Sequence, residues 1–170
     1  YWLYDYAGVN PQNGNALWRN EEGLLTENYG EARRINAGSP EPLWTGGFNT
    51  ELSWKGISLG IQLEARYGNK VLNQDRSLFE ADGSYGDSNI WKGALNYWKK
   101  PGDTNVLPKP IYNNSSNSSQ ISTRYLEDGS YLRIKDITLA YNLPSKWTKK
   151  ALMSGVRIYA SALNLYTFHN

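Results

Sequence analysis

The feature that most constrains the fold of this chain is the alternating pattern of residues 46–67. Apolar and polar residues alternate through two runs of about ten residues, and the short reversal Lys55-Gly56 joins the runs. Successive side chains of an extended strand point to opposite faces, so each run has one apolar and one polar face. Two such runs separated by two residues predict an antiparallel hairpin over residues 46–68. One face of this hairpin must meet something apolar.

A second extended segment covers roughly residues 124–143. In its second half Ile137, Leu139 and Tyr141 alternate with Thr138, Ala140 and Asn142. Leu132 and Ile134 are out of phase with these positions, which predicts a β-bulge near Lys135-Asp136. Pro144 ends the strand because proline cannot donate a backbone hydrogen bond. A basic turn over 144–154 and a final strand over 155–167 follow.

Composition leaves two environments open for such strands. The chain is 39% hydrophobic and 14% aromatic, with seven Trp and thirteen Tyr against three Phe. Trp and Tyr have an apolar body and a polar tip, and they suit boundaries between water and apolar surroundings. A β-sandwich with a Tyr-rich surface fits equally well. No run of eighteen apolar residues exists, which excludes a transmembrane helix, whereas barrel strands need only about 9–11 alternating residues.

Charge and residue usage argue against several other functions. The net charge of +2 is too small to indicate nucleic-acid binding. The chain has no cysteine, so it can form neither a disulfide framework nor a thiolate metal site. Its one histidine, His169, lies beside the last residue and argues against a Ser-His-Asp arrangement. We therefore expect no catalytic residue, no metal, no cofactor and no enzymatic activity.

The segments that connect the four predicted long strands are short (55–56), long (69–123) and short (144–154). Residues 1–45 are loop-rich, with possible short strands at 1–6 and 16–19. Residues 69–123 are polar and irregular and end in an Asn/Ser-rich tract. Such a long insertion is awkward in a small compact domain but ordinary for an extracellular loop of a barrel. If residues 69–123 are an extracellular loop of a barrel, Lys55-Gly56 and residues 144–154 are turns on the periplasmic side.

Four groups of residues match motifs of one known family in the same order along the chain. The first is the turn Ala7-Gly8-Val9-Asn10-Pro11 with Gly14. The second runs from Pro42, Trp44 and Gly46-Gly47-Phe48 to Trp54-Lys55-Gly56 and Tyr67-Gly68-Asn69. The third is Trp98 with Pro101-Gly102-Asp103-Thr104 and Pro108. The fourth is Tyr125–Pro144, followed by Ile158-Tyr159-Ala160-Ser161 and residues 164–168. Together they resemble the carboxy-terminal barrel region of SusC/RagA-type TonB-dependent transporters, which import nutrients across the bacterial outer membrane.

The resemblance implies an all-β fold, an antiparallel transmembrane β-barrel to which residues 1–170 contribute only some strands. It implies import of a glycan or peptide together with a SusD-like surface lipoprotein. The family's plug domain and TonB box are absent here, so coupling to TonB would pass through residues outside this chain. We expect an interior fragment whose partners are the remainder of its own polypeptide and outer-membrane lipid. The alternative is a soluble, secreted carbohydrate-binding β-sandwich.

Candidate site residues fall into two groups, and neither is a catalytic set. In the hairpin, we expect Glu51, Gln62, Glu64 and Arg66 to face the lumen, with Leu59, Ile61, Leu63 and Leu139 facing lipid. Glu51 and Glu64 could also be read as the carboxylate pair of a glycosidase, but lining of the lumen is the much stronger interpretation of these two residues. In the long segment, Trp91, Tyr97 and Trp98 are candidate ligand contacts, although packing that anchors the loop is the favoured role of Trp98.

Two further patterns in the long segment favour simple loop residues. The acidic residues Glu80, Asp82 and Asp87 lack the spacing of a calcium loop and predict a solvated surface. Asn113 and Asn114 fit glycosylation sequons, but a bacterial setting makes them ordinary loop positions.

Overall fold

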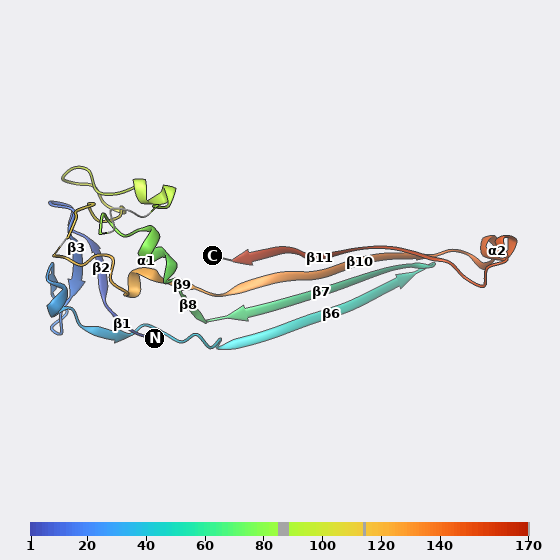
Figure 1. Ribbon diagram of the computed structural model, residues 1–170. Coiled ribbons are helices and arrows are strands. Elements are labelled where there is room, and N and C mark those ends of the chain that lie inside the picture. The colour runs from blue at the N-terminus through green and yellow to red at the C-terminus, as the bar shows by residue number, and fades with distance from the viewer. Residues whose placement is uncertain (85–88, 114, 170) are drawn as a thin grey trace. The chain divides into compact units, whose positions relative to one another are not determined.

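A computed structural model describes residues 1–84, 89–113 and 115–169 (Figure 1). The chain divides into two compact units. The first comprises Tyr1–Ser39 and Val71–Glu127, and the second comprises Pro40–Lys70 and Asp128–Asn170. Within the described ranges, none of the helices has the length and apolar character needed to cross a membrane.

The second unit contains a four-stranded antiparallel sheet. Its strands are β6 (Trp44–Trp54), β7 (Ile57–Tyr67), β10 (Tyr131–Asn142) and β11 (Arg157–His169), in the spatial order β11-β10-β7-β6. The predicted hairpin is confirmed, because Trp54 pairs with Ile57 across Lys55-Gly56. Both turn residues have positive φ, 47° and 87°, as the favoured two-residue hairpin turn requires.

The predicted β-bulge is also confirmed. The register of β10 shifts between Ile134 and Asp136 against both β7 and β11. Ile137 pairs with Ile61 and Ile134 pairs with Leu63, so Lys135 is the extra residue. The bulge therefore returns Leu132 and Ile134 to the face that carries Ile137, which explains their phase in the sequence.

At the end of the sheet that holds the Lys55-Gly56 turn, β10 and β11 are joined by a short helical connection (Figure 1). Pro144 is followed by α2 (Ser145–Thr148) and the 3-10 helix η4 (Lys149–Ala151). Two short strands, β8 (Lys70–Leu72) and β9 (Leu126–Asp128), pair where the chain passes between the units.

The first unit is built from short elements around a small core. β1 (Trp2–Tyr4) pairs with β5 (Arg34–Asn36), and β2 (Tyr6–Val9), β3 (Ala16–Arg19) and β4 (Leu25–Thr26) form a three-stranded sheet. The helical turns are η1 (Tyr29–Glu31), α1 (Asp75–Phe79), η2 (Lys92–Leu95) and η3 (Thr123–Tyr125).

Trp18 organises the core of this unit. Its ring is fully buried, and the rings of Tyr6 and Tyr29 pack edge-on at 5.5 and 5.1 Å between centroids. Its Nε1 donates a hydrogen bond of 3.0 Å to the carbonyl oxygen of Ser116. Residues 1–39 and 71–127 are thus held together by shared packing, although each reads as loop-rich in the sequence.

Candidate functional site

The four-stranded sheet presents two chemically different faces. Directly opposed residues of an antiparallel pair lie on the same face, so the pairing assigns every side chain. The apolar face carries Trp44, Phe48, Leu52, Trp54, Ile57, Leu59, Ile61, Leu63, Tyr67, Leu132, Ile134, Ile137, Leu139, Tyr141, Ile158, Tyr166 and Phe168.

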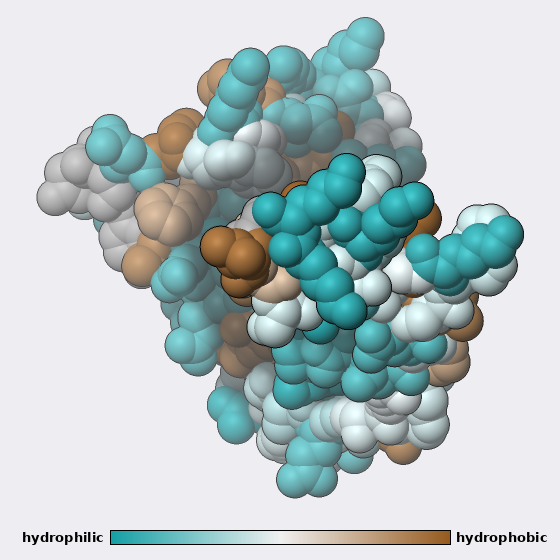
Figure 2. Space-filling model, turned by 90° about the vertical axis from the view of Figure 1, so that its right-hand side faces the viewer, coloured by the Kyte–Doolittle hydropathy of each residue, from teal (hydrophilic) through white to brown (hydrophobic). Residues whose placement is uncertain are grey.

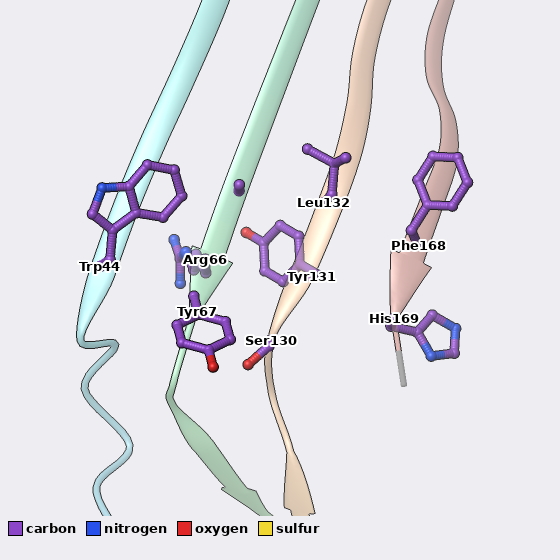
Figure 3. A pocket seen from close by; sticks show the side chains of 9 residues that line it. Trp44, Arg66, Tyr67, Ser130, Tyr131, Leu132, Phe168 and His169 are labelled. Atoms are coloured by element: carbon purple, nitrogen blue, oxygen red, sulfur yellow. The ribbon is translucent and has the colours of Figure 1, made fainter.

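Aromatic side chains mark both ends of this apolar face. Figure 3 shows one end, where Trp44, Tyr67 and Phe168 project from three strands around a cavity of about 550 Å³. Trp54 and Tyr141 lie at the other end, beside the hairpin turn and the helical connection. The band between them is mainly aliphatic, and its exceptions are Phe48, Tyr166 and Thr50. From Ile57 to Tyr67 a strand rises roughly 33 Å, or about 25 Å along the barrel axis at a tilt of about 40°, which matches the apolar band of outer-membrane barrels.

The apolar face is not covered by the described part of the chain. Phe48, Leu52 and Ile158 are 58%, 62% and 60% exposed. A β-sandwich would bury these side chains against a second sheet, as sheet-on-sheet packing requires. An uncovered apolar surface of this extent marks contact with a membrane or with another protein surface.

The opposite face is mainly polar, with Tyr159 and Leu163 exposed on β11, and it carries the four residues expected at a lumen. Glu51 pairs with Gly60, Asn49 with Gln62, Gly47 with Glu64, and Thr45 with Arg66. All four candidates therefore share one face, and Ile61 and its apolar neighbours lie on the other. That this polar face lines a lumen remains a proposal.

Glu64 is the centre of a hydrogen-bonded cluster on this polar face. The Tyr131 hydroxyl donates to Glu64 Oε1 at 2.7 Å, and Lys135 Nζ donates to Oε2 at 3.1 Å. Arg66 Nε lies 3.9 Å from Oε1. Because Lys135 is the extra residue of the bulge, the bulge supplies a cation to this face. Sequence reasoning missed Tyr131 and Lys135 as partners, although the predicted bulge was the signal that could have suggested Lys135.

The polar face can hold hydrogen-bonding solutes, but its carboxylates do not form a glycosidase-like pair. Glu51 and Glu64 lie opposite Gly60 and Gly47, four residues apart along the strands. That separation is roughly 13 Å at about 3.3 Å per residue, beyond the range of about 5–9.5 Å used in glycoside hydrolysis. Among residues 1–84, 89–113 and 115–169, no cluster of three or more His, Cys, Asp or Glu could hold a metal ion.

In the first unit, two arginines bind a buried acidic cluster. Arg124 donates to Asp82 Oδ1 at 3.1 Å and to the Ser118 carbonyl at 2.8 Å. Arg76 Nε donates to Glu80 Oε1 at 3.0 Å. The side chains of Arg124 and Asp82 are only 3% and 4% exposed. The expectation of a solvated acidic surface is therefore wrong for Glu80 and Asp82, and Asp87 lies outside the described residues.

Burial perturbs the titration of this cluster and its tyrosines. Burial raises the pKa of Asp82, against the opposing effect of Arg124. Burial lowers the pKa of Arg124, but the hydrogen bonds and the electrostatic attraction of Asp82, with contributions from Tyr125 and Tyr6, together outweigh it, and the net shift of the pKa is upward. Burial also raises the pKa of Tyr6 to about 12 and raises that of Tyr125. The guanidinium thus stays charged and both phenols stay neutral through the physiological range.

The three aromatic candidates of the long segment occupy different environments. Trp98 is only 7% exposed, and its Nε1 donates to the Pro11 carbonyl oxygen at 3.1 Å. A Cβ atom on Gly14, which has φ +83°, would lie 2.7 Å from the Trp98 ring. These contacts support the favoured anchoring role of Trp98.

Trp91 and Tyr97 are more accessible than Trp98. Trp91 is 56% exposed and lines a cavity of about 340 Å³ with Arg76, Phe79, Asn89 and Ile90. Tyr97 is half-buried, and Lys99 Nζ lies 5.3 Å from its ring centroid. Asn113 is exposed, and Asn114 lies outside the described residues.

The sheet defines the class: long antiparallel strands, an uncovered apolar face with aromatic ends, and a charged opposite face are the features of outer-membrane barrel sheets. No protein-family model matches the chain. The TonB-dependent receptor P3 of Formosa agariphila is 34% identical over 137 residues, which are 81% of this chain and 13% of that protein. The TonB-dependent receptor P26 of the same organism is 29% identical over 156 residues, 89% of this chain and 15% of that protein.

Solved structures give the same match. The RagAB peptide transporter superposes with a TM-score of 0.82 at 32% identity, and the aligned region covers 99% of this chain and 19% of the matched chain. The RagAB peptide importer in its closed-closed state superposes equally well over 100% of this chain. The chain is thus related by sequence and fold to TonB-dependent receptors of the SusC/RagA type, and it spans less than one fifth of their length.

Proposed function

We propose that the chain forms part of the wall and outer mouth of a TonB-dependent nutrient importer in the bacterial outer membrane. The observation that carries this proposal is the two-faced sheet. Its apolar face would contact lipid, and its polar face, with Glu51, Gln62, Glu64 and Arg66, would line the lumen. The fragment itself would do no chemistry.

The sheet must continue into the rest of the same polypeptide. β6 and β11 are the outermost strands of the sheet, and lipid does not tolerate unpaired backbone groups at a sheet edge. Closure into a barrel by other strands would satisfy these groups. Outer-membrane transporters of about 22 strands have a lumen that is filled by a plug, and in the complete protein such a plug would couple transport to TonB.

The first unit would lie on the extracellular side and form part of the outer mouth. A SusD-like lipoprotein would close over this mouth, as an expectation from the similarity to the RagAB transporter. That transporter carries peptides, so we propose a nutrient that is a peptide or a glycan. Trp91 and Tyr97 are the side chains available for contact with it.

Membrane partitioning tests the location. The complete protein should remain in membranes washed with salt and be recovered only with detergent. Release by buffer or salt alone would contradict the barrel and favour a soluble binding protein. Purification of the intact complex and identification of the copurified ligand would then define the substrate class.

Replacing Trp91 with alanine is expected to weaken nutrient binding about two- to tenfold without changing stability. An aromatic contact contributes about 0.5–1.5 kcal/mol, and the Trp91 side chain is more than half exposed, at 56%. Binding of the copurified ligand to the intact complex would be measured by calorimetry.

Trp98→Phe is the matched control. It removes the Nε1 hydrogen bond to Pro11 and should lower stability by about 1–2 kcal/mol with little direct effect on affinity. If wild type and Trp91→Ala bound the nutrient with equal affinity, Trp91 would not be a ligand contact.

A further inference from the structure

All the charge at the α2 end of the four-stranded sheet is positive. Residues 52–60 and 137–162 contain five cationic side chains, Lys55, Lys146, Lys149, Lys150 and Arg157, and no Asp or Glu. The whole chain has 18 Lys and Arg against 16 Asp and Glu, so this asymmetry is local. In the part of the chain that the structure describes, none of the five forms an ion pair.

Exposed apolar side chains stand among these cations. Trp147, Leu152 and Met153 are all exposed on the connection between β10 and β11. Figure 2 looks onto this end and shows hydrophilic side chains gathered beside a hydrophobic group. Cations mixed with exposed apolar residues are typical of segments that rest in the headgroup region of a membrane.

A groove on the apolar face opens at the same end. A cavity of about 500 Å³ is lined by Ile57, Leu139, Tyr141, Ile158, Ala160 and the turn residue Lys55. Ala160 pairs with Leu139, and its small side chain leaves room between two larger neighbours. Lys55 Nζ lies 4.7 Å from the centroid of the Trp54 ring, so its ammonium group stays at the edge of the apolar face.

We infer that this end binds an anionic glycerophospholipid of the periplasmic-side leaflet. One acyl chain would lie in the groove over Ala160, and the phosphate would contact Lys55 and the lysines of the connection. Charge complementarity selects an anionic headgroup, since each cation near a membrane surface strengthens binding about fivefold. The inference rests on the proposed location in the outer membrane.

Native mass spectrometry of the complete receptor in a non-ionic detergent tests the inference. Phosphatidylglycerol and phosphatidylcholine of equal chain length are added, and the bound lipids are counted. Wild type should retain phosphatidylglycerol at least about fivefold better. K146Q/K149Q/K150Q should abolish most of that preference, while K92Q/K99Q/K100Q, with the same change of charge elsewhere, should keep it.

A160F tests the groove separately, because it fills the hollow without changing charge. It should reduce retention of both lipids, and unchanged retention would overturn the groove as the acyl site. Equal binding of the two lipids by wild type would overturn the inference and would favour an acidic protein as the partner of these cations. Preferential binding of lipopolysaccharide would overturn the assigned leaflet. In each case recovery of the protein from membranes only with detergent would show that the proposed location still holds.

Discussion

Replacing Arg124 with methionine is expected to destabilise the first unit by about 3–5 kcal/mol, because it leaves buried carboxylates without their cation. Arg124 lies between Asp82 and Glu80, whose side chains are almost completely buried. It also donates to the Ser118 carbonyl and therefore joins residues 118–124 to residues 80–82. Hydrogen exchange of residues 71–127 in the complete receptor would measure the loss, since the sheet of the second unit should keep its protection.

Arg34→Met is the matched control for this prediction. Arg34 lies over the Tyr4 ring at 4.4 Å and donates a hydrogen bond of 3.1 Å to the Tyr4 hydroxyl. Its removal should cost less than about 1 kcal/mol. Adding Asp82→Asn to Arg124→Met should recover part of the loss, because the amide can be buried neutral. If the hydrogen exchange of residues 71–127 were the same in both arginine variants, the buried ion pairs of Arg124 would not contribute the expected stability to the first unit.

The strands of the second unit could be predicted from the sequence because one physical rule governs them. Period-2 alternation over eleven residues of β7 has no helical alternative. The phase break at Lys135 indicated the bulge for the same reason, since a face change in the sequence must be absorbed in the backbone. The Lys55-Gly56 pair marks the ends of β6 and β7 as the structure has them, and β10 ends at Asn142, two residues before Pro144.

The first unit could not be predicted in the same way. Its strands have only two to four residues, too few for a pattern to stand out from chance. Its core depends on long-range contacts, such as the hydrogen bond from Trp18 to Ser116, 98 residues away. Glu80 and Asp82 looked like surface residues because nothing nearby in the sequence reveals that Arg124 accompanies them into the interior.

The polar face of the sheet shows where sequence reasoning about a site stops. The period-2 alternation of the two strands places Glu51, Gln62, Glu64 and Arg66 on one face, and the register of β6 against β7 agrees. Parity cannot say that Tyr131 and Lys135 bind Glu64, because that depends on which strand lies beside β7 and on the register of the bulge. The sequence separates these partners by 67 and 71 residues.

Ile61→Arg is expected to impair assembly of the complete receptor, whereas Gln62→Arg should assemble normally. The two residues are neighbours on β7 but lie on opposite faces of the sheet. Near the middle of the membrane an arginine on the lipid face costs about 2–4 kcal/mol, and the cost on a water-filled side is small. Because both variants add the same charge within one residue of each other, any difference between them reports the facing of the strand.

The amount of folded receptor in detergent extracts of washed membranes measures assembly, and nutrient uptake by the same cells measures passage. Ile61→Arg should lower the first quantity, while Gln62→Arg should leave it unchanged and alter only the second. Gln62 lies two residues from Glu64 on the polar face, so an added cation there changes the field that a solute meets. Equal assembly of the two variants, or a block by Gln62→Arg alone, would reverse the assignment of lipid and lumen to the two faces.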